Sequence, residues 1–139
     1  MCVRCDSRIG FFPDDPAGAE VISRLTAFVT EGRRDEARAL VEEAKARWPV
    51  TPYFWFFSAL AYTESGETSA GLAELAVALG LAPDSPVLFQ CLARIIREQG
   101  GDETASAIMD VGWSKFLALG LVQDEASARA AFYEEGPTL

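Results

Sequence analysis

Two cysteines near the start of the chain have the spacing that most resembles a reactive site. Cys2 and Cys5 form a CxxC motif, which in redox proteins opens a helix that lowers a thiol pKa. No strand precedes this motif, and Cys91 brings the thiols to three, one short of the four ligands of a structural zinc site. We interpret Cys2 and Cys5 as exposed thiols with no native role, and therefore only as weak metal candidates, and Cys91 as a small apolar core residue. A zinc half-site completed by a second chain stays open as an alternative.

No other group of residues predicts catalysis or a bound cofactor. The chain has no histidine, which removes the commonest general base and metal ligand. The pair Gly100-Gly101 is not followed by the Lys-Ser/Thr of a phosphate-binding loop, and there is no nucleophile elbow. Adjacent carboxylates are expected at helix starts or on outer faces, where the helix dipole or water stabilises them. We therefore predict that the protein is not an enzyme and has no cofactor.

The charge balance excludes several classes of partner. The chain has 21 acidic and 12 basic residues and a net charge of −9, the opposite of what a phosphate backbone attracts. The first residues lack the apolar stretch of a secretory signal. The longest nearly uncharged run follows Ser69 and is broken by Glu74, far short of the roughly 18 residues of a membrane span. With cysteines suited to a reducing compartment, we expect a soluble, cytoplasmic protein that binds no nucleic acid.

The clearest pattern in the sequence is an interval of 34 residues. Within each of three groups, one of glycines, one of small residues and one of larger apolar residues, successive members lie 34 residues apart. These are Gly32, Gly66 and Gly100; Ala37, Gly71 and Ala105; and Val41, Leu75 and Met109. An interval of this size is typical of stacked helical hairpins. In such a stack the small residues allow paired helices to approach closely, and the large ones fill the space beside them.

The middle unit resembles a tetratricopeptide repeat (TPR). Trp55, Tyr62 and Pro83 match the family pattern W-x2-L-G-x2-Y, A-x3-F and P, while Gly71 and Leu75 keep its small and large positions. The first and third units match more loosely, and the third has Leu117 where the proline is expected. The resemblance covers residues 18–119. It implies an all-α, right-handed α-solenoid of three TPR helical hairpins with a capping helix.

This resemblance sets the expected organisation of the chain. Residues 1–14 are predicted to be a flexible leader that carries the CxxC motif, and residues 15–136 the TPR domain. The repeats are placed at about 18–51, 52–85 and 86–119, and the capping helix at about 124–134. Paired helices are expected at 16–31 and 34–47, 52–65 and 68–81, and 86–99 and 102–118.

Several residues are expected to define the ends and faces of these helices. Asp15, Thr51 and Ser85, each followed by proline, are predicted N-caps, and Gly32 is predicted to close the first helix in the left-handed conformation. The second helix is expected to expose a solvated face that carries Arg38, Glu42, Glu43 and Lys45. The capping helix is expected to cover Trp113 and Phe116 with Ala126, Ala130 and Tyr133.

The resemblance also implies a partner-binding groove, because the first helices of TPR hairpins line a concave surface. Transferring that stripe by register predicts a groove that changes from apolar, through aromatic, to basic. The predicted groove residues are Ile22, Thr26, Val29, Tyr53, Phe56, Phe57, Leu60, Thr63, Gln90, Arg94 and Arg97.

Five consecutive large side chains at 53–57 are more than one helix face can bury. We expect Trp55 to lie between helices and Phe54 against the preceding helix, which leaves Phe56 and Phe57 facing the groove. The alternative is that all five belong to the core. Arg94 and Arg97 lie three residues apart and can face one carboxylate, or they pair with Glu98 or Asp102.

The predicted function is that of a protein–protein interaction module, adaptor or chaperone-like. It would hold an apolar partner segment flanked by acidic groups, in a plan similar to bacterial class II secretion chaperones. The TPR clamp that uses Lys and Asn is absent, since the chain has no Asn. Alternatives are a permanent structural subunit and a metal or redox protein that uses Cys2 and Cys5. A homodimer through Ala73, Ala76 and Val77 and occupancy of the groove by Phe11-Phe12 also stay open.

Overall fold

The computed structural model describes residues 11–83, 85–120 and 122–134, the last without the Glu134 side chain. All regular secondary structure in these ranges is helical. The helices are α1 (Pro16–Thr30), α2 (Arg34–Arg47), α3 (Pro52–Glu64), α4 (Thr68–Leu81), α5 (Pro86–Glu98), α6 (Asp102–Ala118) and α7 (Glu125–Glu134). The all-α prediction is confirmed for the described residues, and every predicted helix end agrees within one residue. The predicted leader, with Cys2 and Cys5, lies outside these ranges except for its last four residues.

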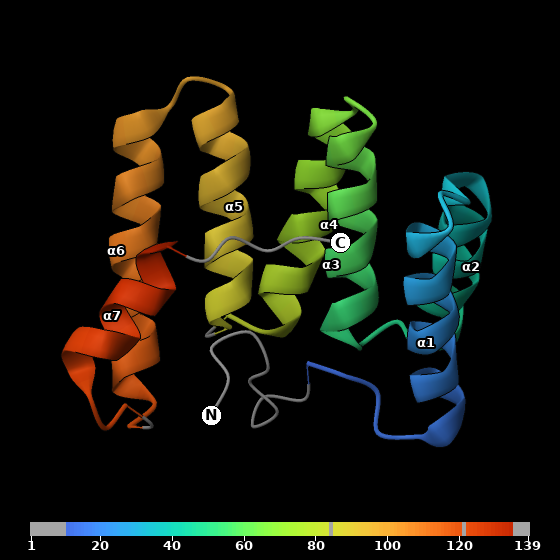
Figure 1. Cartoon of the computed structure of the whole chain (residues 1–139), viewed down its shortest axis with the longest axis horizontal. Helices are drawn as coiled ribbons and strands as arrows, with labels where there is room; N and C mark the ends of the chain where they lie inside the picture. The colour runs from blue at the N-terminus through green and yellow to red at the C-terminus, as the bar shows by residue number, and fades with distance from the viewer. Residues whose placement is uncertain (1–10, 84, 121, 135–139) are drawn as a thin grey trace.

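The helices form three antiparallel pairs that stand side by side (Figure 1). The pairs are α1–α2, α3–α4 and α5–α6, and each contacts the next through consecutive helices, α2 with α3 and α4 with α5. The last helix, α7, packs across α5 and α6. Because each pair has an apolar face that only its neighbours cover, the three pairs stabilise one another. Within the described residues, none of the helices has both the length and the apolar character that crossing a bilayer requires.

The repeated glycines end the first helix of each pair. Gly32, Gly66 and Gly100 have φ angles of 74°, 82° and 88°, the left-handed region that glycine enters without a Cβ penalty. The amide after each glycine donates to a carbonyl five residues back, as Arg33 does to Phe28 at 2.8 Å. This geometry satisfies carbonyls left free at the helix end. The prediction for Gly32 is confirmed, and the same turn explains why the glycines recur at one interval.

The predicted helix starts are correct in position but not all in mechanism. Asp15 caps α1, since its Oδ1 accepts a hydrogen bond from the Gly18 amide at 2.6 Å. That bond, with a second from the Trp48 indole, lowers the pKa of Asp15. Thr51 and Ser85 occupy the cap positions of α3 and α5, but neither side chain bonds to its helix. The prolines that follow them provide the helical φ of the first turn.

The core consists of apolar clusters within and between the helix pairs. The repeated small and large positions are all buried, as predicted. Gly71 shows why α3 and α4 need a small residue, because an added Cβ would lie 2.4 Å from Thr63 Oγ1 and 3.0 Å from the Ala59 carbonyl. Leu75 and Ala78 of α4 then pack with Phe56, Ala59 and Leu60 of α3 and with α5.

Lys45 contradicts the prediction of a wholly solvated outer face on α2. Its side chain is 8% exposed, and its ammonium bonds to Glu42 at 2.8 Å, to the Ser58 hydroxyl at 3.3 Å and to Glu74. Ser58 donates to the same Glu74 oxygen at 3.0 Å. The ammonium also lies 4.9 Å from the Trp55 ring centroid. The charge is buried because carboxylates from two helices compensate it, so this cluster links α2, α3 and α4.

The pKa of Lys45 makes this cluster testable. Burial by itself lowers that pKa, but the hydrogen bonds to Glu42 and Glu74 outweigh burial and raise it above its ordinary value of 10.5. The cluster's stabilisation is therefore complete below pH 10.5 and is lost as the pH rises through the folded-state pKa. Glu74→Gln is expected to lower the free energy of unfolding by about 2 kcal/mol at neutral pH. In urea titrations this difference should shrink at alkaline pH, as the pH rises above 10.5 and Lys45 loses its proton.

Glu67→Gln is the matched control for this prediction. Glu67 pairs with Arg38 at 3.1 Å, but half of its side chain is exposed, so its loss should cost less than about 1 kcal/mol. An effect of Glu74→Gln that stays constant from neutral to alkaline pH would show that the charge on Lys45 does not stabilise the fold.

The capping helix covers Trp113 and Phe116 as predicted, but of the three predicted residues only Tyr133 packs against their cluster. Ala126 and Ala130 are exposed, whereas Phe132 is fully buried, with its ring 5.7 Å from that of Trp113 and 6.3 Å from that of Phe116. Ala128 packs beside it. The prediction was wrong for Ala126 and Ala130, because a phenylalanine buries far more apolar surface than two alanines and Phe132 therefore sets which side of α7 faces α6.

Candidate functional site

The predicted groove is divided into an open part and a closed part. α1 and α3, both described over their whole length, have no pair of Cα atoms within 8 Å, whereas α3 and α5 do approach within that distance. The inner stripe is therefore open between the first two helix pairs and packed between the second and third. The helix stripe predicted from register exists, but it does not form one continuous groove.

Four predicted groove residues lie in the core instead. Phe56 and Phe57 are 8% and 4% exposed, and Leu60 is fully buried. Phe56 and Leu60 pack against α4 and α5, while Phe57 packs against α1 and α2. Gln90 is also buried, and its amide nitrogen donates to the Phe132 carbonyl of α7 at 2.8 Å. The expectation that Phe56 and Phe57 are exposed in the groove is wrong, since neighbouring helices cover α3 on both sides.

Of the other aromatic residues of α3, Phe54 is buried as predicted, whereas Trp55 is more exposed than predicted. Phe54 is fully buried against α2 and stacks on Trp48 at 5.5 Å, as predicted. Trp55, predicted to be buried, is half-buried, with its indole nitrogen donating to the Pro49 carbonyl at 3.0 Å. One face of the helix cannot bury five large side chains. Trp55 and Tyr53 therefore stay partly exposed, because each has a polar indole or phenol group that can face water.

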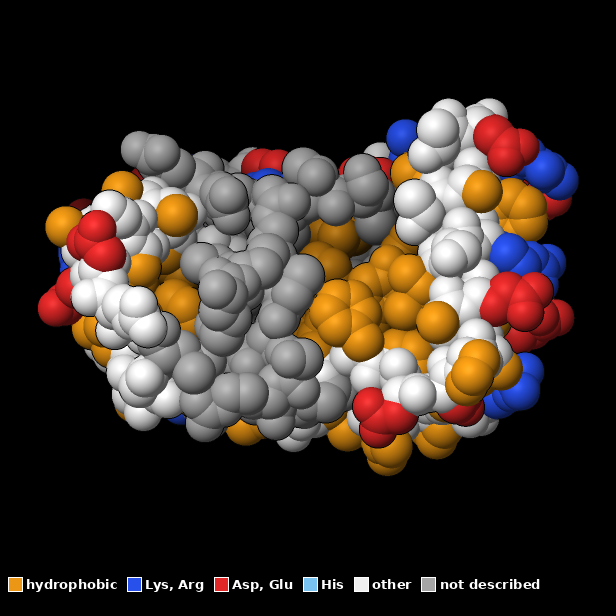
Figure 2. Space-filling model, turned by 60° about the horizontal axis from the view of Figure 1, so that its bottom comes forward, with side chains coloured by type: hydrophobic (Ala, Val, Ile, Leu, Met, Phe, Trp, Pro, Cys, Tyr) orange, Lys and Arg blue, Asp and Glu red, His pale blue; other side chains and the backbone are white. Residues whose placement is uncertain are grey.

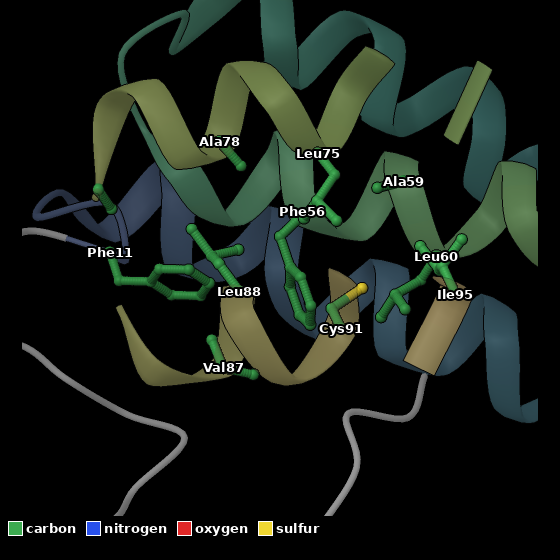
Figure 3. Close-up of a cluster of buried hydrophobic side chains, with 11 residues drawn as sticks. Phe11, Phe56, Ala59, Leu60, Leu75, Ala78, Val87, Leu88, Cys91 and Ile95 are labelled. Atoms are coloured by element: carbon green, nitrogen blue, oxygen red, sulfur yellow. The ribbon is translucent and has the colours of Figure 1, made fainter. Parts of the chain in front are cut away.

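Phe11 occupies the aromatic end of the stripe. Its ring is 2% exposed and lies 5.7 Å from the Phe56 ring and 6.1 Å from the Tyr53 ring. Figure 3 shows it pointing toward Leu88 and Phe56, where α3 and α5 meet. The Tyr53 amide donates to the Phe11 carbonyl at 3.0 Å. The alternative that Phe11-Phe12 occupies the groove is thus observed for these two residues.

The open part of the stripe is an apolar hollow between α1 and α3. Ile22 and Val29 of α1, Tyr53 of α3, and Phe12 pack against the buried clusters but keep part of their surface exposed. Thr26, between the two aliphatic residues, is exposed and donates to the Ile22 carbonyl at 3.0 Å. Figure 2 shows hydrophobic side chains gathered in a hollow beside the α1–α2 end of the molecule. We call the surface of Ile22, Val29 and Tyr53 the α1–α3 hollow, and the Phe12 ring lies against its Tyr53 end at 5.3 Å.

A small pocket extends this hollow toward the C-terminal ends of α1 and α3. It is lined by Val29, Arg34, Ala37, Arg38, Phe57, Ala61 and Ser65. Its two cations are already paired, Arg34 with Glu64 at 2.9 Å and Arg38 with Glu67 at 3.1 Å. At the other end, burial raises the pKa of Tyr53 to about 12, so the phenol stays neutral at physiological pH. The hollow therefore presents apolar surface with compensated charges at one rim.

The predicted basic zone on α5 is separate from the hollow. Arg97 is exposed, and Arg94 is half-buried with its Nε 3.9 Å from Glu98. The predicted aromatic zone between the hollow and Arg94 is filled by the packed rings of Phe11 and Phe56. Binding of an acidic group by Arg94 and Arg97 stays a prediction, as does contact of a partner with Thr63, which is half-buried on α3 and bonds to the Ala59 carbonyl at 2.8 Å.

Comparisons of the chain with protein-family models, curated proteins and solved structures found no match. The TPR resemblance therefore depends on the repeat positions alone. The helix ranges and the glycine turns agree with it, but neither is specific to that family. What the site can do must be inferred from its own side chains.

Groups that could carry chemistry are scarce among the described residues. Within that part of the chain, no three His, Cys, Asp or Glu side chains gather closely enough to hold a metal ion. Cys91 is fully buried, and burial raises the pKa of its thiol to about 12. Cys91 is thus a protonated core residue, as predicted. Cys2 and Cys5 lie outside the described residues.

One feature of the site was missed by sequence reasoning, and another was only left open as an alternative. The separation of α1 from α3 is invisible in a repeat pattern, because the interval between equivalent residues is unchanged. The position of Phe12 at the hollow is the one left open, on the signal of two adjacent aromatic residues, Phe11 and Phe12. Such a pair outside the repeats needs apolar surface to cover it, and it lies against Tyr53 and Phe56 of α3.

Proposed function

We propose that this protein is a TPR-like interaction module that holds an apolar segment of a protein partner in the α1–α3 hollow. The observation that carries this proposal is the set of half-buried apolar side chains on two helices that have no pair of Cα atoms within 8 Å of each other. Partly exposed aromatic and aliphatic groups on rigid elements are the surfaces on which binding energy concentrates. In this function the three helix pairs act as a scaffold, and the chain supplies no chemistry of its own.

The apolar character of the partner follows from the surface of the hollow. Its aliphatic residues offer no hydrogen bonds, and the nearby Arg34 and Arg38 are already paired with carboxylates. A charged partner segment would therefore lose its hydration without gaining a compensating partner. An apolar segment gains burial of surface, with the free phenol of Tyr53 available to orient it.

The proposal predicts a specific loss of binding. Peptides of about twelve residues selected by phage display on the wild-type protein are expected to be rich in apolar side chains. Replacing Ile22 and Val29 together by Gln should weaken these peptides about thirtyfold, or about 2 kcal/mol, because glutamine preserves the helix but removes apolar contact surface. Affinities would be measured by isothermal titration calorimetry.

Val111→Gln is the matched control, since Val111 is a half-exposed valine on α6, away from the hollow. It should leave the affinities unchanged. Selected peptides that bind the Ile22/Val29 double variant as tightly as wild type would place binding elsewhere and overturn the proposal. The same peptides also test the predicted acidic flank, because Arg97→Glu should weaken them only if acidic residues reach α5.

Self-association is a separate prediction that the structure allows to be tested. Ala73, Ala76 and Val77 are exposed on the outer side of α4, as expected from the sequence. Sedimentation equilibrium of wild type and Val77→Asp would decide whether this face joins two chains. A monomer at all concentrations would remove the homodimer from consideration.

A further inference from the structure

Phe11 and Phe12 fill a site made by residues that belong to the helix pairs. Phe11 packs with Phe56 of α3 and with Val87 and Leu88 of α5, and the Phe12 ring lies 5.3 Å from that of Tyr53. The two phenylalanine rings are themselves 5.1 Å apart and nearly perpendicular. The two adjacent aromatic side chains therefore enter two neighbouring positions, a buried one that holds Phe11 and a half-buried one that holds Phe12.

The site also recognises the backbone of this segment. The Tyr53 amide lies in the first turn of α3, where no carbonyl of the helix can accept it. It donates instead to the Phe11 carbonyl at 3.0 Å. Any extended segment that presents a carbonyl between two aromatic side chains could supply the same acceptor. The Tyr53 amide donor and the two apolar positions together select a segment with two adjacent aromatic residues and an accepting carbonyl. They do not select every apolar segment equally.

The segment is joined firmly to α1 on its C-terminal side. Pro13 packs so closely on Gly18 that an added Cβ at Gly18 would lie 2.4 Å from the Pro13 Cβ. Two residues later, Asp15 caps α1 and accepts a hydrogen bond from the Trp48 indole at 3.1 Å. Phe11 and Phe12 themselves lie in neither a helix nor a strand. They can leave the site without breaking a helix or the α1 cap.

We propose that Phe11-Phe12 is a built-in ligand that occupies the aromatic end of the partner site, and that the partner is a protein segment with two adjacent aromatic residues that displaces it. This inference rests on the proposed function and adds the chemistry of the partner to it. The chain's own segment is the template, since it shows which side chains and which backbone acceptor the site accepts. Binding in this scheme is an exchange, and the internal segment lowers the affinity for weaker competitors.

The first test supplies the ligand in trans. The probe is an acetylated and amidated peptide of sequence Gly-Phe-Phe-Pro-Asp-Asp, which repeats residues 10–15. The Phe11→Ala/Phe12→Ala variant is expected to bind it at least about tenfold more tightly than wild type, because its own site is empty. The control peptide Gly-Ala-Ala-Pro-Asp-Asp should bind neither protein. Equal affinity of the Phe peptide for both proteins, or no binding to a folded variant, overturns the inference.

A second test uses only the wild-type protein and so does not depend on the variant folding. If Phe11-Phe12 leaves while α3 stays folded, the Tyr53 amide should exchange with solvent at least about a hundredfold faster than the Phe57 amide, one helical turn further on. Native-state hydrogen exchange measured by NMR gives both rates. Equal protection of the two amides would mean that the segment opens only when α3 itself unfolds, and the inference would fail.

The two proposals fail separately. If the selected peptides depend on Ile22 and Val29 but the Phe peptide does not bind the double alanine variant, the interaction module stands and the built-in ligand does not. If neither set of substitutions changes the binding of any selected peptide, the hollow is not the partner site and both are wrong.

Discussion

Replacing Phe56 by alanine is expected to lower the free energy of unfolding by about 3–5 kcal/mol. The ring is 8% exposed and joins Phe11, α3, α4 and α5 in one cluster, so its removal leaves a cavity at the meeting point of two helix pairs. Small domains are stable by only about 5–15 kcal/mol, and this loss is a large share of the total. Urea unfolding followed by circular dichroism measures it.

Val111→Ala is the control for this substitution, because Val111 is half exposed on α6. It should change stability by less than about 0.5 kcal/mol. The sequence alone predicted a different place for Phe56, facing the groove with Phe57, where replacing the two rings would weaken partner binding. A Phe56→Ala variant that unfolds at the wild-type urea concentration would support that earlier prediction and contradict the packing described here.

Replacing Phe132 by alanine is expected to release α7 from the third helix pair. Phe132 is fully buried between Trp113 and Phe116, and its removal is expected to cost about 3 kcal/mol. α7 is also linked to the third helix pair by a hydrogen bond from Gln90 to the Phe132 carbonyl and by one from Tyr133 to Asp110. Because this helix is at the end of the array, its release leaves the first two helix pairs folded.

Limited digestion with trypsin distinguishes release of α7 from global unfolding. Arg129 lies on α7, whereas Lys45 is buried in the cluster that links α2, α3 and α4. In Phe132→Ala, cleavage after Arg129 should become about a hundredfold faster while cleavage after Lys45 stays slow. The exposed residue Ala130 supplies the control Ala130→Ser on the same helix. Equal acceleration at both sites would show that α7 is not a separate unit.

The helices and their turns were predictable because their signals are local. A proline after Asp15, Thr51 or Ser85 and a glycine at the far end determine where a helix can begin and stop. Apolar residues at helical spacing predict a buried face, and the small residue at Gly71 predicts a close approach between α3 and α4. These features act over a few residues, so one sequence contains enough information to place them.

Which face of each helix is buried was predicted less well, because burial depends on which helices pack against it in the folded chain. Lys45 on α2 reads as a surface lysine until Glu74 of α4, 29 residues away, comes within reach of it. Phe132 rather than two alanines covers Trp113, and this outcome depends on how α7 crosses α6. In each case a local pattern allowed two faces, and the larger gain in apolar burial or charge compensation selected one.

From the sequence alone follow the all-α class, the ends of the helices and the buried repeat positions, since these depend on backbone preferences and helical periodicity. Only the tertiary structure decided that Phe56 and Phe57 are core, that α1 stands apart from α3, and that Phe11 fills the aromatic end of the stripe. The physical reason is that a helix with apolar residues on every side does not specify its own outward face. Contacts between residues far apart in the chain decide it, and with it the surface left for a partner.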